Sequence, residues 1–363
     1  MNKETIHQLD TRILDFIHNA TAYSDDAQFQ KLALDLFQYQ YTHNAIYQHF
    51  CNKMGLTPNN VKRWEEIPAL HTASFKEAAI HSTPISDKTV FFETSGTSTS
   101  KKGRHYFDSC LLYDAALIWS FKHYVLPDTE RMDMCILFPD ISELPHSSLA
   151  YMFSILKHSY GTEESKYYSI RGQLQFEALI KDIKTFNHQE KPLLLLGTTL
   201  GFAMFFQKLK ESYGPLKLPP KSRIMDTGGS KGQQQEISRN ELFLLSRKLL
   251  NIDEHAIINE YGMTEMSSQF YDSILFDRMH GLKRSSQKIP PPWVRSRVIA
   301  SDAIHEVKIG EKGLLRHLDL ANRNSVCSLQ TEDIALRTED GFELIGRPRT
   351  SELRGCSLLM EEL

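Results

Sequence analysis

Apolar residues recur at the spacing of a helix face within the first fifty residues of the chain. They form two sets: Ile6, Leu9, Ile13 and Phe16, then Phe29, Leu32 and Leu36. Asp25 and Asp26, directly before the second set, are typical of a helix start because a short acidic side chain can cap free backbone N–H groups. The pattern predicts two helices that pack on the body of the fold.

Short β-prone runs separated by helical patterns follow, at residues 89–92, 134–138, 193–196, 223–225 and 256–258. Continuous apolar strands alternating with helices favour a largely parallel sheet that helices cover on both faces. After Pro290, Pro291 and Pro292 the pattern changes to short β-like pieces with turns. We therefore predict an α/β fold, with an α/β core and N-terminal helices in residues 1–290 and a small β subdomain in residues 291–363.

Composition narrows the class of protein. The chain has 363 residues, of which 41% are hydrophobic and 24% charged, as in ordinary globular proteins. Its net charge of −3 offers no positive excess for a nucleic-acid backbone, so no nucleic-acid partner is expected. The polar N-terminus and the short aliphatic run 193–196 predict no signal peptide and no membrane span.

The five cysteines are scattered and odd in number, and none forms a CxxC pair. This spacing supports neither a disulfide framework nor a zinc site, so a reduced, cytoplasmic protein is expected. Cys51, Cys110 and Cys135 lie in apolar or helical contexts and are predicted to be packing residues.

The segment 93–103 combines the groups that a polyphosphate needs. It offers hydroxyls at Thr94, Ser95 and Thr97, a freed backbone amide at Gly96, and a positive charge at Lys101, directly after an apolar strand. The alternative is a solvated polar loop, and the Walker spacing is absent.

Two further segments carry glycine beside polar groups. In residues 259–265, Glu265 could hold Mg²⁺ together with phosphate oxygens, and Tyr261 could stack on a base. The alternative there is an ordinary helix start capped by Thr264. In residues 226–230, the paired Gly228 and Gly229 allow a ligand to approach the backbone closely, although a tight turn explains them equally.

The fourth segment lies near the end of the chain. A carboxylate at Asp333 could accept hydrogen bonds from the two vicinal hydroxyls of a ribose, and Gly346-Arg347 follows it. Each segment is a weak signal alone, and their order along the chain is what makes them informative.

Taken in order, the segments resemble the adenylate-forming superfamily of acyl-CoA synthetases. Residues 94–101 are similar to its phosphate loop, and residues 261–265 (Tyr-Gly-Met-Thr-Glu) match its YGxTE motif. Asp333 and Arg347 fall where its ribose-binding aspartate and hinge motif belong. Within the superfamily the chain is similar to the acyl-protein synthetase family, through residues 66–68 (Glu-Ile-Pro), 74–76 (Ser-Phe-Lys), 145–151 (Pro-His-Ser-Ser-Leu-Ala-Tyr) and the ending 352–357 (Glu-Leu-Arg-Gly-Cys-Ser).

The resemblance implies ATP-dependent activation of a fatty acid to an acyl-adenylate, with Mg²⁺ as cofactor. It implies transfer of the acyl group to Cys356, beside Arg354, and onward to an acyl-accepting protein such as a reductase or carrier. The resemblance implies the phosphate loop with Lys101 for the β- and γ-phosphates, Thr264 for the α-phosphate, Glu265 for Mg²⁺ and Tyr261 for the adenine face. It implies Asp333 for the ribose hydroxyls, Arg347 in the hinge motif, and Gly228, Gly229 and Gly262 for binding the nucleotide. His146 would orient the substrate.

Two departures leave alternatives open. Adenylate-forming ligases continue past the hinge into a mobile lid with a catalytic lysine, whereas only a short segment follows Arg349 here. We therefore expect the lid to be largely missing, and Lys101, Lys102, Arg347 or a partner protein to replace its lysine. The alternatives are a ligase of the phenylacetate type that ends with coenzyme A, and a nucleotide- or acyl-binding subunit without catalysis.

Five apolar residues are candidates for an acyl tunnel: Tyr151, Met152, Phe153, Phe202 and Phe205. An ordinary core is the alternative for them.

Overall fold

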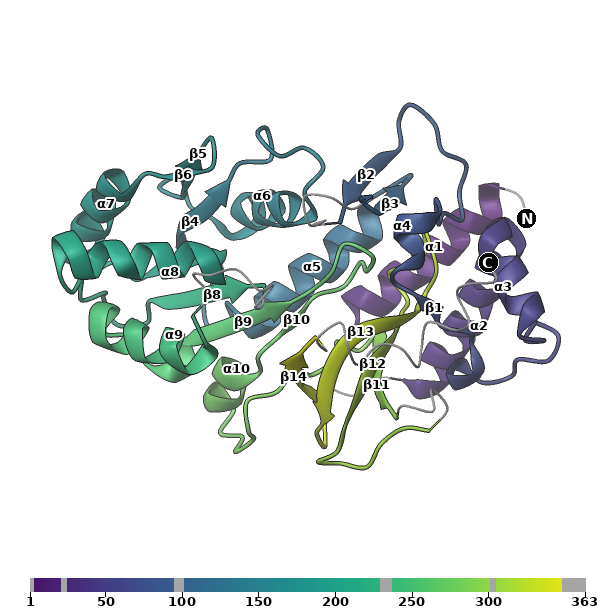
Figure 1. Ribbon diagram of the computed structural model, residues 1–363. Helices are drawn as coiled ribbons and strands as arrows, with labels where there is room; N and C mark the ends of the chain where they lie inside the picture. The colour runs from purple at the N-terminus through teal and green to yellow at the C-terminus, as the bar shows by residue number, and fades with distance from the viewer. Residues whose placement is uncertain (1–2, 21–24, 95–100, 229–236, 301–304, 348–363) are drawn as a thin grey trace. The chain divides into compact units, whose positions relative to one another are not determined.

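The computed structural model describes residues 3–20, 25–94, 101–228, 237–300 and 305–347 (Figure 1). The chain forms two compact units. The first comprises residues 1–116, 264–268 and 287–363, and the second comprises residues 117–263 and 269–286. Helix α5 (Leu111–Tyr124) contributes residues to both units.

The second unit is built on a seven-stranded sheet in the order β10-β9-β8-β7-β4-β5-β6. Strands β9, β8, β7, β4 and β5 run parallel, and the edge strands β10 and β6 are antiparallel. The strand bounds are β4 (Asp133–Pro139), β5 (Lys166–Ile170), β6 (Gln173–Leu174), β7 (Leu193–Thr198), β8 (Arg223–Thr227), β9 (Ile257–Tyr261) and β10 (Phe270–Tyr271). The predicted largely parallel sheet is therefore confirmed.

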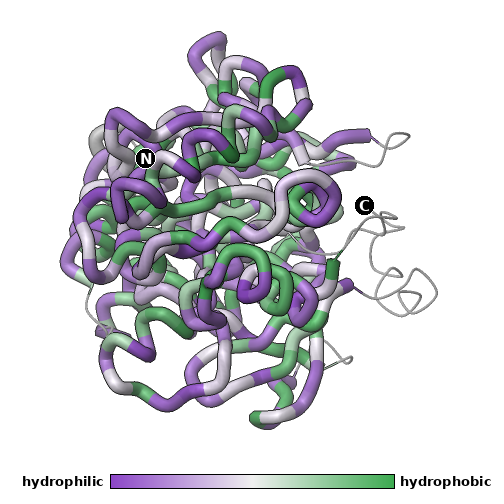
Figure 2. Tube along the Cα trace, turned by 90° about the vertical axis from the view of Figure 1, so that its left-hand side faces the viewer, coloured by the Kyte–Doolittle hydropathy of each residue, from purple (hydrophilic) through white to green (hydrophobic). Residues whose placement is uncertain are grey.

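Helices fill the connections between these strands, because a parallel crossover needs a long connection. They are α6 (Ser148–Tyr160), α7 (Phe176–His188), α8 (Thr199–Lys208), α9 (Arg239–Leu245) and the short segments η2 (Leu209–Tyr213), η3 (Ser246–Leu250) and η4 (Glu254–Ala256). Helix α10 (Ile274–Met279) follows β10, after the last strand of this sheet. Hydrophobic and hydrophilic residues alternate along the helices (Figure 2), which lets each helix bury one side against the sheet.

The central strand β4 buries both of its faces. Leu137 points to the face where Phe202 and Phe205 of α8 pack, and all three belong to one apolar cluster. Successive side chains of a strand alternate, so Phe138 points to the opposite face, where its ring lies 5.7 Å from that of Phe153 on α6. Phe153 and the pair Phe202 and Phe205 thus line opposite faces of the sheet as core residues, and do not line one tunnel.

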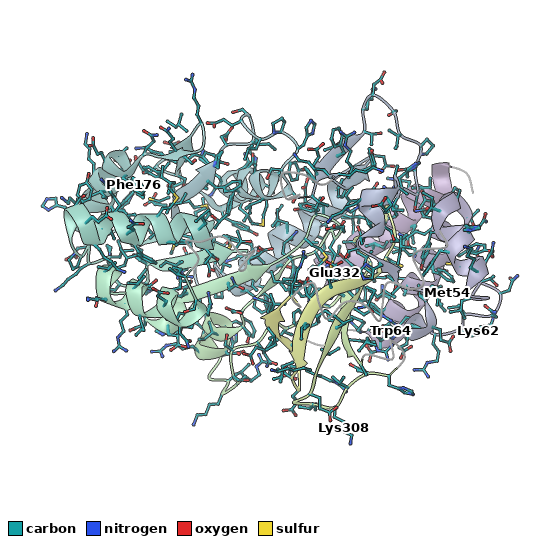
Figure 3. All side chains as sticks on the ribbon, in the orientation of Figure 1. Met54, Lys62, Trp64, Phe176, Lys308 and Glu332 are labelled. Carbon is teal, nitrogen blue, oxygen red and sulfur yellow. The ribbon has the colours of Figure 1, made fainter. Side chains whose placement is uncertain are left out.

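The first unit begins with the two helices that the apolar spacing predicts, α1 (Lys3–His18) and α2 (Asp26–His43), and Asp25 caps α2 by accepting from the Gln28 N–H. The other helical elements are α3 (Ala45–Lys53), η1 (Trp64–Glu66) and α4 (Ser74–Glu77). Trp64 of η1, labelled in Figure 3, packs edge-on against Phe29 of α2, with ring centroids 5.9 Å apart. The described helices include none that is long and apolar enough to cross a membrane.

Five strands of the first unit form a second sheet, with the path β1-β13-β12-β11 and β14 paired to β13. They are β1 (Leu70–His71), β11 (Val294–Ile299), β12 (Lys312–Asp319), β13 (Ser328–Arg337) and β14 (Phe342–Gly346). The β-like texture after residue 290 corresponds to the last four. The two-residue strand β1 joins them in parallel, with Leu70 opposite Leu329.

One apolar run departs from the expected sheet. Residues 89–92 contribute to β2 (Val90–Glu93), which pairs with β3 (Arg104–Phe107) in a separate antiparallel hairpin. The hairpin brings the two ends of the predicted phosphate loop together. The predicted domains 1–290 and 291–363 stay a prediction, since the two compact units divide the chain at other positions and place residues 1–116 with the C-terminal strands.

The connection between β12 and β13 is a turn of buried polar residues, which we call the buried turn (residues 319–325). Asp319, Asn322, Arg323, Asn324 and Ser325 are each at most 2% exposed. Buried polar groups must be paired, because an unpaired one costs the full free energy of desolvation. The buried turn therefore determines which segments of the first unit must meet it.

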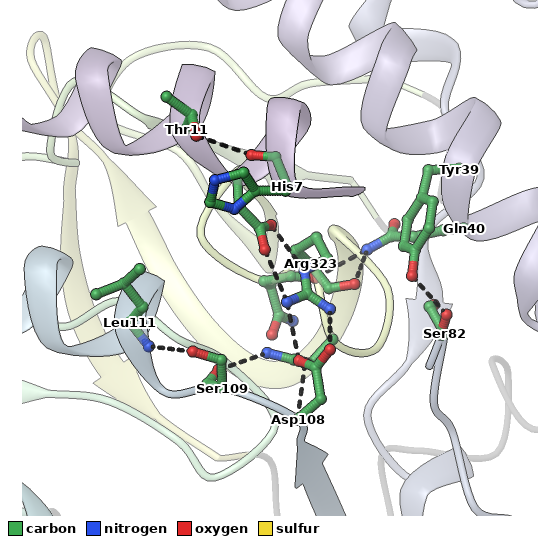
Figure 4. A network of polar contacts seen from close by, with 12 residues as sticks. His7, Thr11, Tyr39, Gln40, Ser82, Asp108, Ser109, Leu111 and Arg323 are labelled. Atoms are coloured by element: carbon green, nitrogen blue, oxygen red, sulfur yellow. Dashed lines mark hydrogen bonds and ion pairs between the residues drawn. The ribbon is translucent and has the colours of Figure 1, made fainter. Parts of the chain in front are cut away.

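Arg323 shows this requirement most plainly (Figure 4). Its guanidinium donates to both carboxylate oxygens of Asp10 on α1, at 2.8 and 3.0 Å, and to both of Asp108 after β3, at 2.8 and 3.1 Å. Gln40 of α2 donates to the carbonyl of Asn322 at 2.8 Å. Helices α1 and α2 and the β2–β3 hairpin are thus attached to one turn.

Replacing Arg323 by Met should lower the free energy of unfolding by about 3 kcal/mol, because the mostly buried carboxylate of Asp10 and the partly exposed one of Asp108 lose a fully buried partner. Arg12→Met is the matched control, since Arg12 also joins α1 to α2 through Asp35, at 2.7 Å, but in a half-exposed pair. An exposed pair contributes less than about 1 kcal/mol. Urea unfolding of both variants measures the difference, and equal losses would contradict the role given to Arg323.

Candidate active site

The base of the predicted phosphate loop is closed by two hydrogen bonds. The Thr94 N–H donates to the carbonyl of Gly103 at 2.9 Å, and the Gly103 N–H donates to the Thr94 hydroxyl, also at 2.9 Å. Glu93 pairs with Lys102 at 3.0 Å and with Arg104 at 3.1 Å. Ser95, Gly96 and Thr97 lie outside the described residues, so their roles stay predictions. Thr94 and Gly103, on either side of that segment, are therefore hydrogen-bonded to each other.

Thr264 and Glu265 belong to the same unit as this loop. The Thr264 hydroxyl lies 3.5 Å from the carbonyl of Glu93, directly before the loop. Burial raises the pKa of the Glu265 carboxyl, Arg347 and Lys76 oppose that shift, and the negative charge of Asp333 adds to it. These three charged residues therefore surround Glu265 closely enough to affect its proton.

Asp333 lies on β13, and Arg347 directly follows the neighbouring strand β14. The Arg347 Nε donates to Asp333 Oδ1 at 2.8 Å, and Asp333 is buried whereas Arg347 is largely exposed. Glu332, next to Asp333 on β13 (Figure 3), lies on the alternate face of the strand. The structure thus brings together Thr94, Thr264, Glu265, Asp333 and Arg347 in the first unit. Lys101 is exposed and makes a long contact of 3.4 Å with the carbonyl of Glu77.

Asp319 of the buried turn anchors the residues that follow Glu265. Its carboxylate accepts from the Ser267 N–H at 3.2 Å and from the Ser268 hydroxyl at 2.8 Å. Ser268 also accepts from the Trp293 indole N–H at 2.9 Å. Burial raises the pKa of Asp319 to about 6, although these hydrogen bonds favour the charged form.

The second unit gathers polar groups at the carboxyl ends of its parallel strands, where α/β sheets bind ligands. Arg239 bridges Asp226, near the end of β8, and Asp272, directly after β10, each at 2.5 Å. The Thr199 hydroxyl lies within 3.2 Å of both the Asp226 carboxylate and the Gly228 carbonyl. Gly228 has a φ of +88°, which favours glycine. Gly229 lies outside the described residues.

Position 262 requires glycine because the side chain of Glu260 lies too close to leave room for a Cβ atom. A Cβ added there would lie 2.5 Å from Oε1 of Glu260, whose other carboxylate oxygen accepts a hydrogen bond from the Thr227 hydroxyl. Any larger residue at 262 would therefore displace the Glu260 carboxylate. Tyr261 is buried, with its ring 5.7 Å from that of Phe270 on β10. Its predicted stacking on a base stays a prediction.

His146 is exposed on the loop that joins β4 to α6. This loop leaves the sheet at the same edge as those after β7 and β8, because the three strands are parallel. The placement is compatible with a ligand role, which stays a prediction.

The cysteines of the described residues differ in how far they are buried. Cys51, Cys135 and Cys327 are buried, as the packing interpretation of Cys51 and Cys135 requires. Burial raises the pKa of Cys51 and Cys135 to about 12, and raises that of Cys327 as well. These three thiols are therefore poor nucleophiles at neutral pH. Cys110 is partly exposed, and Cys356 lies outside the described residues.

A family model described as "Acyl-protein synthetase, LuxE" matches residues 1–363, the whole chain. The chain belongs to the acyl-protein synthetase family. The resemblance found in the motifs is thereby confirmed.

Two bacterial relatives have similar sequences over most of the chain. A "long-chain-fatty-acid--luciferin-component ligase" of Aliivibrio fischeri is 24% identical over 344 residues, which cover 91% of this chain and 87% of the relative. The protein of the same name from Vibrio harveyi is 23% identical over 371 residues, covering 97% of this chain and 93% of the relative.

Solved structures support the fold of this acyl-protein synthetase family member. A 2-hydroxyisobutyryl-CoA ligase, in complex with 2-HIB-AMP and CoA, superposes with a TM-score of 0.63 at 12% identity, covering 88% of this chain and 70% of the ligase. A long-chain-fatty-acid-CoA ligase from Archaeoglobus fulgidus gives a TM-score of 0.50 at 14% identity, covering 75% and 53%. At such identities the likeness establishes the α/β fold of these ligases.

Sequence reasoning missed several residues around the candidate site. Lys76, which affects the Glu265 proton, was quoted only within the family segment 74–76. Asp319, Arg239 and Asp272 carried no local motif, because their roles arise from pairing with residues far away in the chain.

Asp319→Asn should flatten the pH dependence of stability. The folded state binds the Asp319 proton more tightly than the unfolded chain does, since the pKa rises from 3.8 to about 6. The carboxyl's contribution is therefore greatest at low pH and is lost as the pH rises towards 6. As the pH rises from 4 to 7, the free energy of unfolding of the variant should therefore increase by about 2 kcal/mol relative to that of the wild type.

Urea unfolding at both pH values measures this gain. Asp87→Asn, on an exposed loop, is the control and should leave the pH dependence as in the wild type. A constant difference between Asp319→Asn and the wild type across this range would contradict the assignment.

Proposed function

We propose that this protein uses ATP to activate a fatty acid as an acyl-adenylate and passes the acyl group to a protein cysteine. The observation that carries the proposal is the family match over the whole chain, together with the grouping of Thr264, Glu265, Asp333 and Arg347 in one unit with the closed base of the loop. The names of the relatives, which refer to long-chain fatty acids, support the class of substrate.

Adenylation requires a carboxylate to attack the α-phosphate of ATP, which brings two anions together. Positioned donors and cations offset this repulsion, and such electrostatic stabilisation is commonly the largest catalytic contribution. In the proposal, the Thr264 hydroxyl donates to the α-phosphate, while residues 95–97 with Lys101 hold the β- and γ-phosphates. Lys102 forms a salt bridge with Glu93, at 3.0 Å, so in the proposal it stabilises the base of the loop instead of binding phosphate.

Mg²⁺ would bind at Glu265. The described residues contain no cluster of three or more histidine, cysteine, aspartate or glutamate side chains that could hold a metal. Mg²⁺ at nucleotide sites typically takes one or two carboxylates and draws its other ligands from phosphates and water. A single half-buried carboxylate with a raised pKa fits this pattern, because a bound cation would favour its ionised form. The metal would neutralise phosphate charge.

Asp333 would accept from the ribose hydroxyls, and the adjacent Arg347 guanidinium orients its carboxylate. Gly228, Gly229, Tyr261 and Gly262 would provide the surface for the base. His146 would orient the carboxylate of the acid.

Transfer would follow at Cys356. Its thiolate attacks the carbonyl carbon of the acyl-adenylate, the C–S bond forms, and AMP leaves with the electrons of the C–O bond. The burial of Cys51, Cys135 and Cys327 supports this choice, since their protonated thiols are unsuited to attack. The thioester would then pass to an acyl-accepting protein, a reductase or a carrier.

ATP–pyrophosphate exchange should depend on the length of the acid. A panel of acids from acetate to palmitate, with phenylacetate included, should give exchange that peaks with a long-chain acid and needs Mg²⁺. Glu265→Gln should reduce the exchange at least tenfold, because the variant loses a metal-binding carboxylate. A maximum with phenylacetate would favour a ligase of that type, and nucleotide binding without exchange would favour a non-catalytic subunit.

Cys356→Ala should abolish acylation of the protein and leave the exchange reaction unchanged. Incubation with ATP, Mg²⁺ and the preferred acid should add one acyl mass to the wild type, released by hydroxylamine, as intact-mass spectrometry measures. Cys110→Ala, which removes a partly exposed thiol, is the control and should acylate normally. An acyl mass on Cys356→Ala, or product formation only with coenzyme A, would refute transfer to Cys356.

A further inference from the structure

We propose that His105 and Asn322 are positioning residues, which hold the backbone of Thr264 and Glu265 so that these side chains meet the phosphates and Mg²⁺. This inference rests on the proposed function of Thr264 and Glu265. It assigns a role to two residues that belong to none of the motifs.

His105 lies on β3 and is fully buried. Its Nδ1 lies 2.8 Å from the carbonyl of Thr264. A carbonyl only accepts, so Nδ1 carries the hydrogen, and Nε2 accepts from the Ser325 hydroxyl at 3.0 Å. Burial lowers the pKa of His105 to about 4, so the ring keeps this neutral form at neutral pH.

Two aromatic rings also pack against the imidazole of His105. Its centroid lies 4.1 Å from that of Phe107 and 5.7 Å from that of Phe75. With both nitrogens bonded and two aromatic rings packed against it, His105 is held in one orientation, and its Nδ1 donor points at Thr264.

Asn322 of the buried turn holds the next carbonyl. Its Nδ2 donates to the carbonyl of Glu265 at 2.9 Å and to that of Val326 at 2.8 Å. Its Oδ1 accepts from the Ser267 hydroxyl at 3.0 Å. These bonds use both side-chain donors and the acceptor, so the amide cannot be flipped without breaking three bonds.

Two successive carbonyls are thus held from two different elements. Holding them fixes the peptide planes on either side of Glu265 and the directions of the Thr264 and Glu265 side chains. His105 lies two residues after Gly103, which closes the base of the phosphate loop. The same strand therefore connects the loop to Thr264, and displacements near 1 Å in such sites can cost about 100-fold in rate.

The test compares two amides at position 105. The side-chain amide of Asn reaches the place of Nδ1 and that of Gln reaches the place of Nε2, so only His105→Asn can still donate to Thr264. The probe is α,β-methylene ATP, whose dissociation constant is measured by calorimetry with and without Mg²⁺. The ratio of the two constants gives the benefit of the metal.

We expect His105→Gln to reduce the benefit of Mg²⁺ about tenfold, and His105→Asn to stay within threefold of the wild type. Ser325→Ala, a milder change, should reduce it about threefold because the ring loses its Nε2 partner. Ser82→Ala is the control for stability, since Ser82 donates to the carbonyl of Ser325 and touches neither Thr264 nor Glu265. Ser82→Ala should lower the melting temperature and leave the metal benefit unchanged.

A wild-type Mg²⁺ benefit in His105→Gln, or equal losses in Ser82→Ala and Ser325→Ala, would overturn the positioning role. The binding readout needs no turnover, so it separates the two claims. A wild type that binds the analogue with Mg²⁺ but exchanges no pyrophosphate would refute the proposed function, and the variants would still decide the role of His105. A wild type without nucleotide binding would refute both.

Discussion

The first unit depends on one constraint, the need to pair every polar group of the buried turn. Asp319, Asn322, Arg323, Asn324 and Ser325 lie where water does not reach, so their donors and acceptors must find partners in the protein. The partners come from α1, α2, the β2–β3 hairpin and residues 264–268. Four segments that are distant in the sequence are thereby held at one place, with a precision that apolar packing alone does not provide.

This constraint connects stability to the proposed chemistry. Arg323 attaches the N-terminal helices, whereas Asn322 and Ser325 act on the Thr264–Glu265 peptide directly or through His105. The segment that contains the YGxTE motif begins in the second unit, at the end of β9, and continues in the first unit from Thr264 onward. Each unit thus contributes part of the motif, and the part proposed to meet phosphate and metal is the part that the buried turn anchors.

Local patterns predicted the features that local physics determines. The helices α1 and α2 and the strands β4, β7, β8 and β9 follow from apolar spacing. Thr264, Glu265 and Asp333 were singled out by their chemistry together with the family resemblance, and their roles stay predictions. The partners of the buried turn could not be predicted in this way, since Gln40 and Asn322 are 282 residues apart. The hairpin of β2 and the strand β1 were missed for the same reason, because pairing across the chain decides them. Phe153 and Phe202 are apolar, as the walls of an acyl tunnel would be. Only their positions on opposite faces of the sheet identify them as core residues.

The most direct measurement is a crystal structure of the protein with Mg²⁺ and a stable acyl-adenylate analogue, an acyl-sulfamoyl adenosine with a long chain. The account predicts that the ribose hydroxyls bond to the Asp333 carboxylate and that the sulfamoyl group lies against the Thr264 hydroxyl. It also predicts that the carbonyls of Thr264 and Glu265 remain bonded to His105 and Asn322. An analogue bound away from Thr264 and Asp333, or a Thr264–Glu265 peptide released from both side chains, would contradict the account.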